Sequence, residues 1–191
     1  MELDDLKSMV LKCRKCPLYK FRTNPVIGFG SIDKGIMLVG EAPGKKEDET
    51  GLPFVGRAGK VLDELLSKAG LKREDVYITN IVKCRPPNNR DPTEEEINAC
   101  KGYLDIQFNI IKPKVLITLG RYSMEHFQKK FNLPKESISR CHGVHYKITT
   151  LYSNLLFVPM YHPAASLYSK LIKKRSIRDW EELGNVLAME Y

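Results

Sequence analysis

The sequence predicts an α/β fold, a three-layer sandwich with a central, mostly parallel four-stranded sheet flanked by helices. Four short apolar runs carry this prediction, because they are nearly continuous and rich in β-branched and aliphatic residues, as strands buried on both faces are. Segments with helical spacing alternate with the runs, which is typical of a parallel sheet. No repeat or linker divides the 191 residues, so we expect one domain over residues 1–191. The runs span residues 35–40, 76–82, 114–120 and 155–161.

Four segments have the spacing of amphipathic helices. The first, residues 57–70, ends at Gly70, a residue type that commonly closes a helix. The second, residues 92–111, opens with Thr93 and Glu96 as a capping box. The other two segments span residues 122–131 and 176–189. The expected core-facing positions are Val61, Leu62, Leu65, Leu66, Ile97, Cys100, Leu104, Phe108, Ile111, Ile177, Trp180, Leu183 and Leu187.

The charge balance points to an anionic partner. Lys and Arg together number 31 against 23 acidic residues, which gives a net charge of +8. A basic protein binds DNA or RNA by neutralising phosphates and releasing counterions. The acidic, mixed start of the chain has no signal-peptide core, and no apolar run approaches the roughly 20 residues of a membrane helix. We therefore expect a cytoplasmic protein that has no membrane partner.

Four of the five cysteines have the spacing of a metal site. Cys13 and Cys16 form a C-x-x-C pair, whereas Cys84 follows the second predicted strand and Cys100 lies on the next predicted helix. Four thiolates suit either Zn²⁺ or a [4Fe–4S] cluster. The alternative is a redox C-x-x-C pair with two buried core thiols. We expect the fifth, Cys141, to be a free and buried thiol.

The loops that follow the predicted strands carry the candidate site, because open parallel sheets bind ligands beyond the carboxyl ends of their strands. The first loop starts with Gly40, Glu41 and Ala42 in a Gly/Pro turn of the kind that often holds a phosphate. Glu41 and Glu47 would repel a phosphate, and no phosphate-loop motif is present. We therefore expect a neutral ligand with donors and acceptors, such as a nucleobase.

Three side chains near these loops suit a nucleobase. Phe54 can stack on a base face, Asn80 can match an edge with alternating C=O and N–H groups, and His162 can donate to a carbonyl. Each also has an ordinary structural explanation, as a core residue, a turn residue and a loop residue. Their common position at strand ends favours a site.

The segment after the fourth run, residues 162–178, combines small and basic residues with Leu167, which we expect to be exposed. This composition suits an element that presses on a phosphate backbone and places an apolar wedge near a base step. A solvated, basic helix start is the alternative.

Taken together, these motifs resemble the family 4 uracil-DNA glycosylases, the iron–sulfur members of the uracil-DNA glycosylase superfamily. The similarity rests on "GEAPG…ED…GLPFVGRAG", "TNIVKCRPPNNR", the four cysteines, "RCHG" and "HPAASL", in the order of the family. It runs from about Cys13 to Leu167 and implies a monofunctional base-excision repair enzyme. Such an enzyme flips uracil out of DNA and hydrolyses its N-glycosidic bond.

The resemblance also implies roles for individual residues. A structural [4Fe–4S] cluster, with zinc less favoured, would be held by Cys13, Cys16, Cys84 and Cys100. Uracil would be held by Gly40, Glu41, Ala42, Phe54, Asn80 and His162. DNA contacts are expected at Arg57, Arg85, Arg90, His142, Ser166, Leu167 and Lys170. The chemistry itself needs no cofactor.

The expected catalytic residues follow from the charge that develops when the bond breaks. His162 and backbone N–H groups would stabilise negative charge on uracil O2. A carboxylate near the sugar would stabilise positive charge or orient water, with Glu41 as the first candidate and Glu47 as the second. The sequence does not separate the two.

Two further features bear on turnover and on partners. A related branch of the superfamily carries a His in the loop after the second strand and traps its product covalently. Here that loop reads "RPPNNRDP" and has no His, so the resemblance implies a turnover enzyme. The chain departs from the family after "HPAASL". Many members of the family have an Arg there, whereas this chain has Tyr168-Ser169-Lys170. We expect a monomer acting on uracil-containing DNA, single- or double-stranded. A sliding clamp is compatible with a repair enzyme as a partner, although the C-terminal "LGNVLAMEY" has no clear clamp-binding motif.

Two other functions fit part of the pattern. A non-catalytic iron–sulfur or zinc DNA-binding module would share the cysteines, the charge and the fold, but it would not need Glu41, Phe54, Asn80 and His162 together. A glycosylase of the same fold for another deaminated base, such as hypoxanthine, would differ mainly in its pocket.

Overall fold

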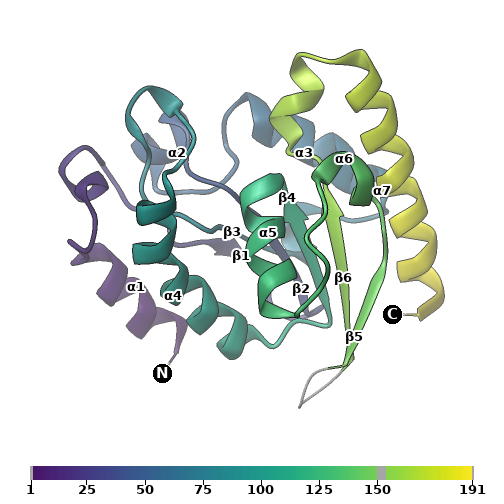
Figure 1. The fold of residues 1–191 in the computed structure, drawn as a ribbon, viewed down its shortest axis with the longest axis horizontal. Coiled ribbons are helices and arrows are strands. Elements are labelled where there is room, and N and C mark those ends of the chain that lie inside the picture. The colour runs from purple at the N-terminus through teal and green to yellow at the C-terminus, as the bar shows by residue number, and fades with distance from the viewer. Residues whose placement is uncertain (1, 150–153, 191) are drawn as a thin grey trace.

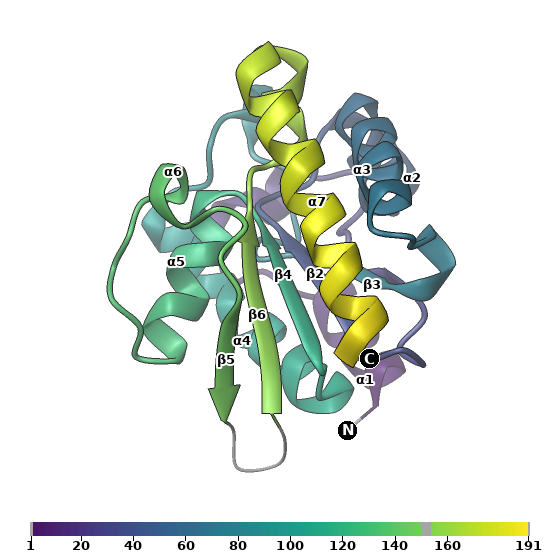
Figure 2. The ribbon, with the colours of Figure 1, turned by 90° about the vertical axis from the view of Figure 1, so that its right-hand side faces the viewer.

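The computed structural model describes residues 2–149 and 154–190. Its centre is one sheet with the strand order β1-β3-β2-β4-β6-β5, of which Figure 2 shows the part from β3 to β5. The four middle strands are parallel to one another and match the four predicted apolar runs, which confirms the parallel core. They are β2 (Ile36–Gly40), β3 (Tyr77–Asn80), β4 (Val115–Leu119) and β6 (Asn154–Met160).

The prediction of four strands is corrected to six, because an antiparallel strand lies at each edge of the sheet. β1 (Phe29–Gly30) has only two residues and is too short to produce a pattern. β5 (Tyr146–Thr149) alternates half-buried and exposed positions, unlike the continuous apolar runs of the centre. One-sided burial is the rule for an edge strand, and it weakens the sequence signal.

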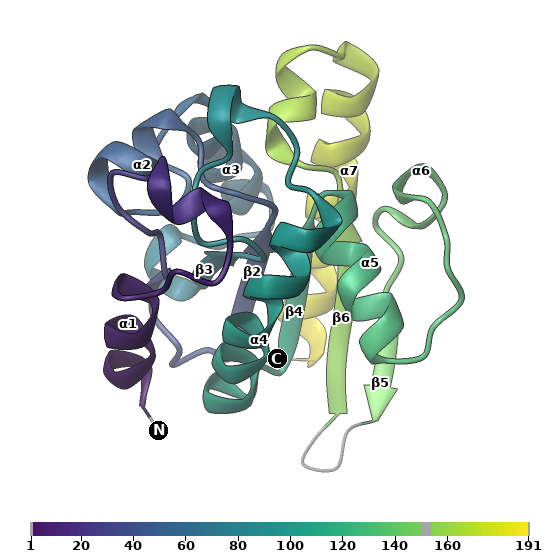
Figure 3. The ribbon, with the colours of Figure 1, turned by 60° about the vertical axis from the view of Figure 1, so that its left-hand side comes forward.

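Helices cover both faces of the sheet and confirm the three-layer arrangement (Figures 1 and 3). One face carries α1 (Leu3–Leu11), α4 (Glu94–Ile111) and α5 (Arg121–Lys130). The other face carries α3 (Arg57–Lys68) and α7 (Lys170–Glu190). The shorter elements are α2 (Lys45–Thr50), α6 (Ile138–Cys141) and the 3₁₀ turns η1 (Pro17–Lys20), η2 (Arg73–Asp75), η3 (Pro87–Asn89) and η4 (Pro163–Leu167).

The predicted capping box starts α4. Thr93 Oγ1 accepts a hydrogen bond from the backbone N–H of Glu96 at 3.3 Å, and Glu96 Oε2 accepts one from the backbone N–H of Thr93 at 2.9 Å. Two donors that the helix leaves free are thereby satisfied. The helix ends at Lys112 in the left-handed conformation, directly before Pro113.

The core lies on both sides of the sheet. Trp180 and Leu62 anchor the α3 and α7 side, whereas Phe127 and Leu104 anchor the α4 and α5 side. Of the predicted core positions, ten are buried, and Ile97, Phe108 and Ile177 are partly buried. The ten buried positions are Val61, Leu62, Leu65, Leu66, Cys100, Leu104, Ile111, Trp180, Leu183 and Leu187.

The carboxyl ends of the parallel strands meet at one edge of the sheet, the upper edge in Figure 1. The loops that follow β2, β3 and β6 therefore lie together there, with α2, η3 and η4 built into them. None of the helices in the described part of the chain is long and apolar enough to span a membrane.

The contact between α3 and α7 depends on Gly184. A Cβ at this position would lie 2.8 Å from Ala69 Cα and 3.0 Å from Ala69 C, both backbone atoms that cannot move aside easily. We predict that Gly184→Ala lowers the melting temperature, since overpacking costs about 1–3 kcal/mol and exceeds the roughly 1 kcal/mol gained in helix propensity.

Gly102→Ala is the matched control, because nothing lies within 4 Å of a Cβ at that helical position. That change should raise stability by up to about 1 kcal/mol. Thermal unfolding followed by circular dichroism measures both variants. Equal stabilisation by the two substitutions would contradict the close packing of α7 on α3.

Candidate functional site

A cleft opens at the carboxyl edge of the sheet, where the sequence places the site. It is lined from the β2 loop, from the start of α3, from the end of β3 and from the segment around η4. The predicted site residues that the structure brings to this cleft are Glu41, Ala42, Glu47, Phe54, Arg57, Asn80, Arg90 and His162.

Gly40 lies beneath this set and allows it to converge. A Cβ on Gly40 would lie 2.4 Å from Asn80 Oδ1 and 2.7 Å from Phe54 Cζ. Real Cβ atoms do not approach neighbours this closely, so any side chain at this position would displace both recognition groups. Gly40 therefore contributes to the predicted site by lacking a side chain, which leaves room for Asn80 and Phe54 between the strand and the loop.

Asn80 presents an unpaired acceptor. Its side chain is buried, with 1% of its surface exposed, and Oδ1 has no hydrogen-bond partner. Burying an amide oxygen without a partner costs about 1–3 kcal/mol, so buried polar atoms are nearly always paired in native proteins. An unpaired acceptor in the wall of a cleft is therefore a good match for a ligand N–H.

Phe54 is held in position by its backbone. Its φ of 52° is left-handed, which is unusual for an aromatic residue. Arg73 fixes the loop by donating to Phe54 O at 2.7 Å and to Pro53 O at 3.1 Å. The ring lies 5.7 Å from the His162 ring, centroid to centroid. The role of Arg73 could not be predicted from the sequence, because nothing in the local pattern around Arg73 links it to a loop about 20 residues away.

His162 presents a neutral donor. The backbone N–H of Ala164 donates to its Nδ1 at 3.1 Å, so the proton of the neutral ring lies on Nε2. Burial lowers the pKa of His162 to about 4, because the charged imidazolium would lose its hydration. At neutral pH the residue is therefore an uncharged imidazole that donates from Nε2.

Glu41 lies at the amino end of α5. The backbone N–H of Tyr122 donates to Glu41 Oε1 at 3.3 Å. Burial raises the pKa of Glu41 above its ordinary range, while the backbone N–H groups of Tyr122 and Arg121 oppose that shift. A carboxyl group with a raised pKa in a cleft is the type of group that acts as a general base near neutral pH.

Glu47 is bound to the loop that carries Phe54. Its Oε1 accepts the backbone N–H groups of Val55 and Gly56, both at 2.9 Å, and its side chain is buried. A carboxylate of the chain itself therefore binds these two N–H groups, which would otherwise be available to an anion.

Several predicted DNA contacts lie outside the cleft lining. Arg85 binds Asn89, while Ser166 is buried and Lys170 is exposed. The ring of His142 lies 4.4 Å from the Tyr161 ring, centroid to centroid and tilted by 31°, and its Nδ1 lies 2.5 Å from the buried carboxylate of Asp179. Inside the cleft, Arg90 makes a paired interaction with Glu96.

The expectation that Leu167 is exposed was wrong. The 3₁₀ turn η4 directs Leu167 towards the core on the α3 and α7 side, where it is partly buried. The next residue, Tyr168, is 81% exposed and lines the cleft instead. A one-residue shift in orientation within a turn leaves no signal in hydrophobic spacing.

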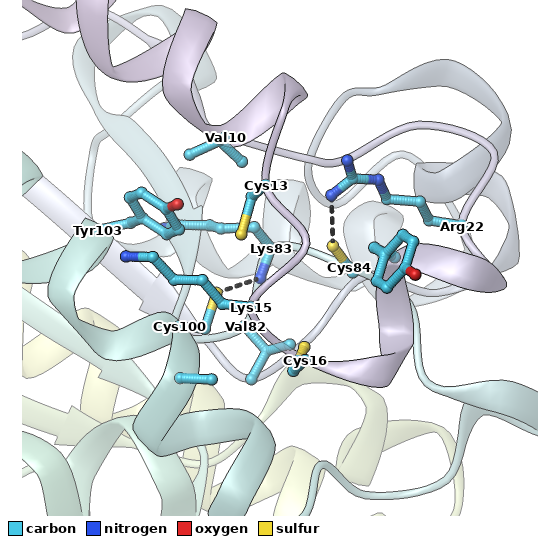
Figure 4. Close-up of a pocket in the computed structure, with 12 residues that line it drawn as sticks. Val10, Cys13, Lys15, Cys16, Arg22, Val82, Lys83, Cys84, Cys100 and Tyr103 are labelled. Atoms are coloured by element: carbon cyan, nitrogen blue, oxygen red, sulfur yellow. Dashed lines mark hydrogen bonds between the residues drawn. The ribbon is translucent and has the colours of Figure 1, made fainter.

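The four predicted metal-ligating cysteines surround a second, smaller cavity (Figure 4). Cys13 and Cys16 come from the segment after α1, Cys84 from the loop after β3 and Cys100 from α4. Within the described residues, no three His, Cys, Asp or Glu side chains are grouped closely enough to hold a single metal ion. The sulfur atoms thus border a shared space rather than converge on one point.

Two basic residues contact this cysteine cavity. Arg22 Nη1 donates to Cys84 Sγ at 3.1 Å, and the backbone N–H of Lys83 donates to Cys100 Sγ at 3.3 Å (Figure 4). Burial raises the pKa of Cys84, and that of Cys100 to about 11. Cys141 is a free thiol and fully buried, as predicted.

Comparison with known proteins places this chain in a family. The family model of the uracil DNA glycosylase superfamily matches residues 27–184. The chain is 49% identical over 187 residues to the type-4 uracil-DNA glycosylase of Saccharolobus solfataricus, covering 97% of this chain and 87% of that protein. The type-4 enzyme of Archaeoglobus fulgidus is 45% identical, covering 96% and 92%. That of Sulfurisphaera tokodaii is 46% identical, covering 95% and 83%.

The chain therefore belongs to the uracil DNA glycosylase superfamily, in its type-4 group. The resemblance that the sequence motifs indicate is confirmed.

The environment of His162 makes a prediction about protonation. We expect its imidazole to titrate with a midpoint near pH 4 in the folded protein. In the unfolded chain this histidine takes up a proton near pH 6.5. The contribution of His162 to the free energy of unfolding should therefore be fully present above pH 6.5 and should decline as the pH falls towards 4. Nitrogen-15 NMR titration measures the midpoint, with His162→Gln identifying its signal among the four histidines. A midpoint of about 6 or higher would contradict the buried, neutral ring.

Proposed function

We propose that this protein removes uracil from DNA by hydrolysing its N-glycosidic bond, as a monofunctional glycosylase of base-excision repair. The observation that carries the proposal is the buried, unpaired Oδ1 of Asn80 in a cleft that also presents Phe54 and a neutral His162. Uracil is a neutral base with a stacking face, one N–H between two carbonyls, and no charge to be balanced. The cleft offers a partner for each of these features.

Asn80 distinguishes uracil from cytosine. Oδ1 accepts from N3–H of uracil, and the amide NH₂ of the same side chain donates to O4. Cytosine has an acceptor at N3 and a donor at its 4-position, so both contacts would become repulsive or unpaired. A site built on such hydrogen bonds rejects the wrong base strongly, because its buried groups are left without partners.

His162 stabilises the leaving group. Negative charge develops on uracil O2 as the glycosidic bond breaks, and a fixed donor aimed at that atom lowers the barrier. The proton on Nε2 serves this purpose, since Nδ1 is held by Ala164. A neutral ring remains a donor throughout the physiological pH range, so binding of the neutral base carries no desolvation cost for an imidazolium.

The two carboxylates have different roles. Glu41 is the general base that orients water towards the sugar, because it lines the cleft and its pKa is raised by burial. Glu47 is a positioning residue, because its Oε1 is committed to the backbone of Val55 and Gly56 next to Phe54. The positive charge that grows on the sugar is opposite in sign to both side chains.

DNA approaches through the basic rim of the cleft. Arg57, Lys45 and Lys46 line this rim, and the chain carries a net charge of +8. The target uracil must leave the base stack to reach Asn80, which costs a few kcal/mol. Tyr168 is exposed at the cleft, where its ring can stack on the bases beside the flipped-out uracil.

We propose that an enzyme with DNA as its substrate works in the cytoplasm, at the nucleoid.

A [4Fe–4S] cluster bound by Cys13, Cys16, Cys84 and Cys100 completes the proposal. Four sulfur atoms around one cavity suit a cluster in which each iron takes one thiolate, whereas zinc needs four ligands on a single point. The cluster would tie α1, the β3 loop and α4 together and would take no part in hydrolysis.

The proposal is tested by base release from a labelled oligonucleotide that carries one uracil, with cytosine, thymine and hypoxanthine controls. We expect alkali-sensitive cleavage at uracil alone. Asn80→Asp should lose most of the preference for uracil over cytosine, because a carboxylate cannot donate to O4, while Glu41→Gln should slow release more than Glu47→Gln.

Two results would count against this account. If the wild-type protein bound DNA in a salt-sensitive manner but released no base, the chain would be a binding module. If Asn80→Asp kept the full preference for uracil over cytosine, the recognition role of Asn80 would be wrong even with the activity intact.

A further inference from the structure

Lys83 is a cation in an unusual place. Its side chain is fully buried, with 0% of its surface exposed, and it lies between the end of β3 and the cysteine cavity that it helps to line (Figure 4). Lysine is almost never fully buried without a charged partner, because an unpaired ammonium loses its hydration at a cost of several kcal/mol.

The hydrogen-bond partners of the Lys83 ammonium group are all neutral. Nζ donates to Thr79 Oγ1 at 2.7 Å, to the backbone carbonyl of Asn80 at 2.6 Å and to Gln107 Oε1. Thr79 and Gln107 in turn donate to Ile27 O, so the network contains no carboxylate. None of the ion pairs found within residues 2–149 and 154–190 includes Lys83.

Lys83 shares the wall of the cavity with the four cysteines, whose thiolates can carry negative charge. The backbone N–H of Lys83 donates to Cys100 Sγ, and Cys84 is its neighbour in sequence. Four thiolates around an iron–sulfur core leave a net negative charge, which is the missing counter-charge for a buried ammonium.

We infer that Lys83 is the buried counter-cation of the iron–sulfur cluster and that its ammonium group joins the cluster to the Asn80 end of β3. The inference rests on the cluster of the proposed function. Lys83 is then a positioning residue. Its Nζ donates a hydrogen bond to the backbone carbonyl of Asn80, the proposed uracil-recognition residue, and its positive charge is balanced by the negative charge of the cluster. Loss of the cluster would therefore loosen the base pocket as well as the α1 region.

The test is the reduction potential of the cluster, measured on anaerobically purified holoprotein by voltammetry. A nearby positive charge favours the reduced cluster, so Lys83→Met should make the potential more negative and speed the loss of iron to a chelator. Lys83→Gln removes the charge but keeps an N–H donor for the buried acceptors, so it serves where Lys83→Met fails to fold.

Lys101→Met is the matched control. Lys101 follows Cys100 directly and loses the same charge, but it hydrogen-bonds Asn98 at the surface, where solvent screens it. Its potential and its iron loss should match those of the wild type.

The outcomes separate the two proposals. Wild-type protein without iron and acid-labile sulfide, or with stoichiometric zinc, would overturn the cluster itself. A wild-type cluster whose potential and iron retention are shared by the Lys83 variants would overturn only the role of Lys83.

Discussion

The site depends on the absence of a side chain at the end of β2. Gly40 leaves a space that Asn80 Oδ1 and Phe54 Cζ occupy, at 2.4 Å and 2.7 Å from where a Cβ would lie. Gly59 does the same at the far end of the loop, because a Cβ there would lie within 2 Å of Phe54 O. The end of β2, the loop that carries Phe54 and the start of α3 can therefore approach each other closely enough to form the walls of the proposed base pocket. The proposed contacts of Asn80 and Phe54 with the base follow from this close approach.

Electrostatics explain why a strand-end loop of this shape suits a neutral base. Backbone N–H groups of such turns commonly hold phosphates. Here Glu47 accepts the N–H groups of Val55 and Gly56, so the chain fills that position with its own carboxylate. Desolvation lowers the pKa of His162 and keeps its ring neutral. The proposed pocket would thus offer single hydrogen-bonding groups to the base, while Glu41 would be available to the cationic sugar of the transition state.

The continuous apolar runs in the sequence made the parallel strands of the core predictable. The position of the cleft was also predictable, because the carboxyl ends of parallel strands lie at the same edge of the sheet. Groups that act across long sequence separations escaped prediction. Arg73 reaches back to the loop of Phe54, and Lys83 sits in a segment where a lysine is expected to face solvent. The edge strands β1 and β5 are too short or too one-sided for a periodic signal, and a 3₁₀ turn partly buries Leu167, which was expected to be exposed.

The most direct test of the pocket is a crystal structure of the protein with free uracil. The account predicts the ring stacked on Phe54, N3–H donating to Asn80 Oδ1, and His162 Nε2 donating to O2. Uracil bound elsewhere, or bound in the cleft with Asn80 Oδ1 still unpaired, would contradict the claim that this buried acceptor selects the base.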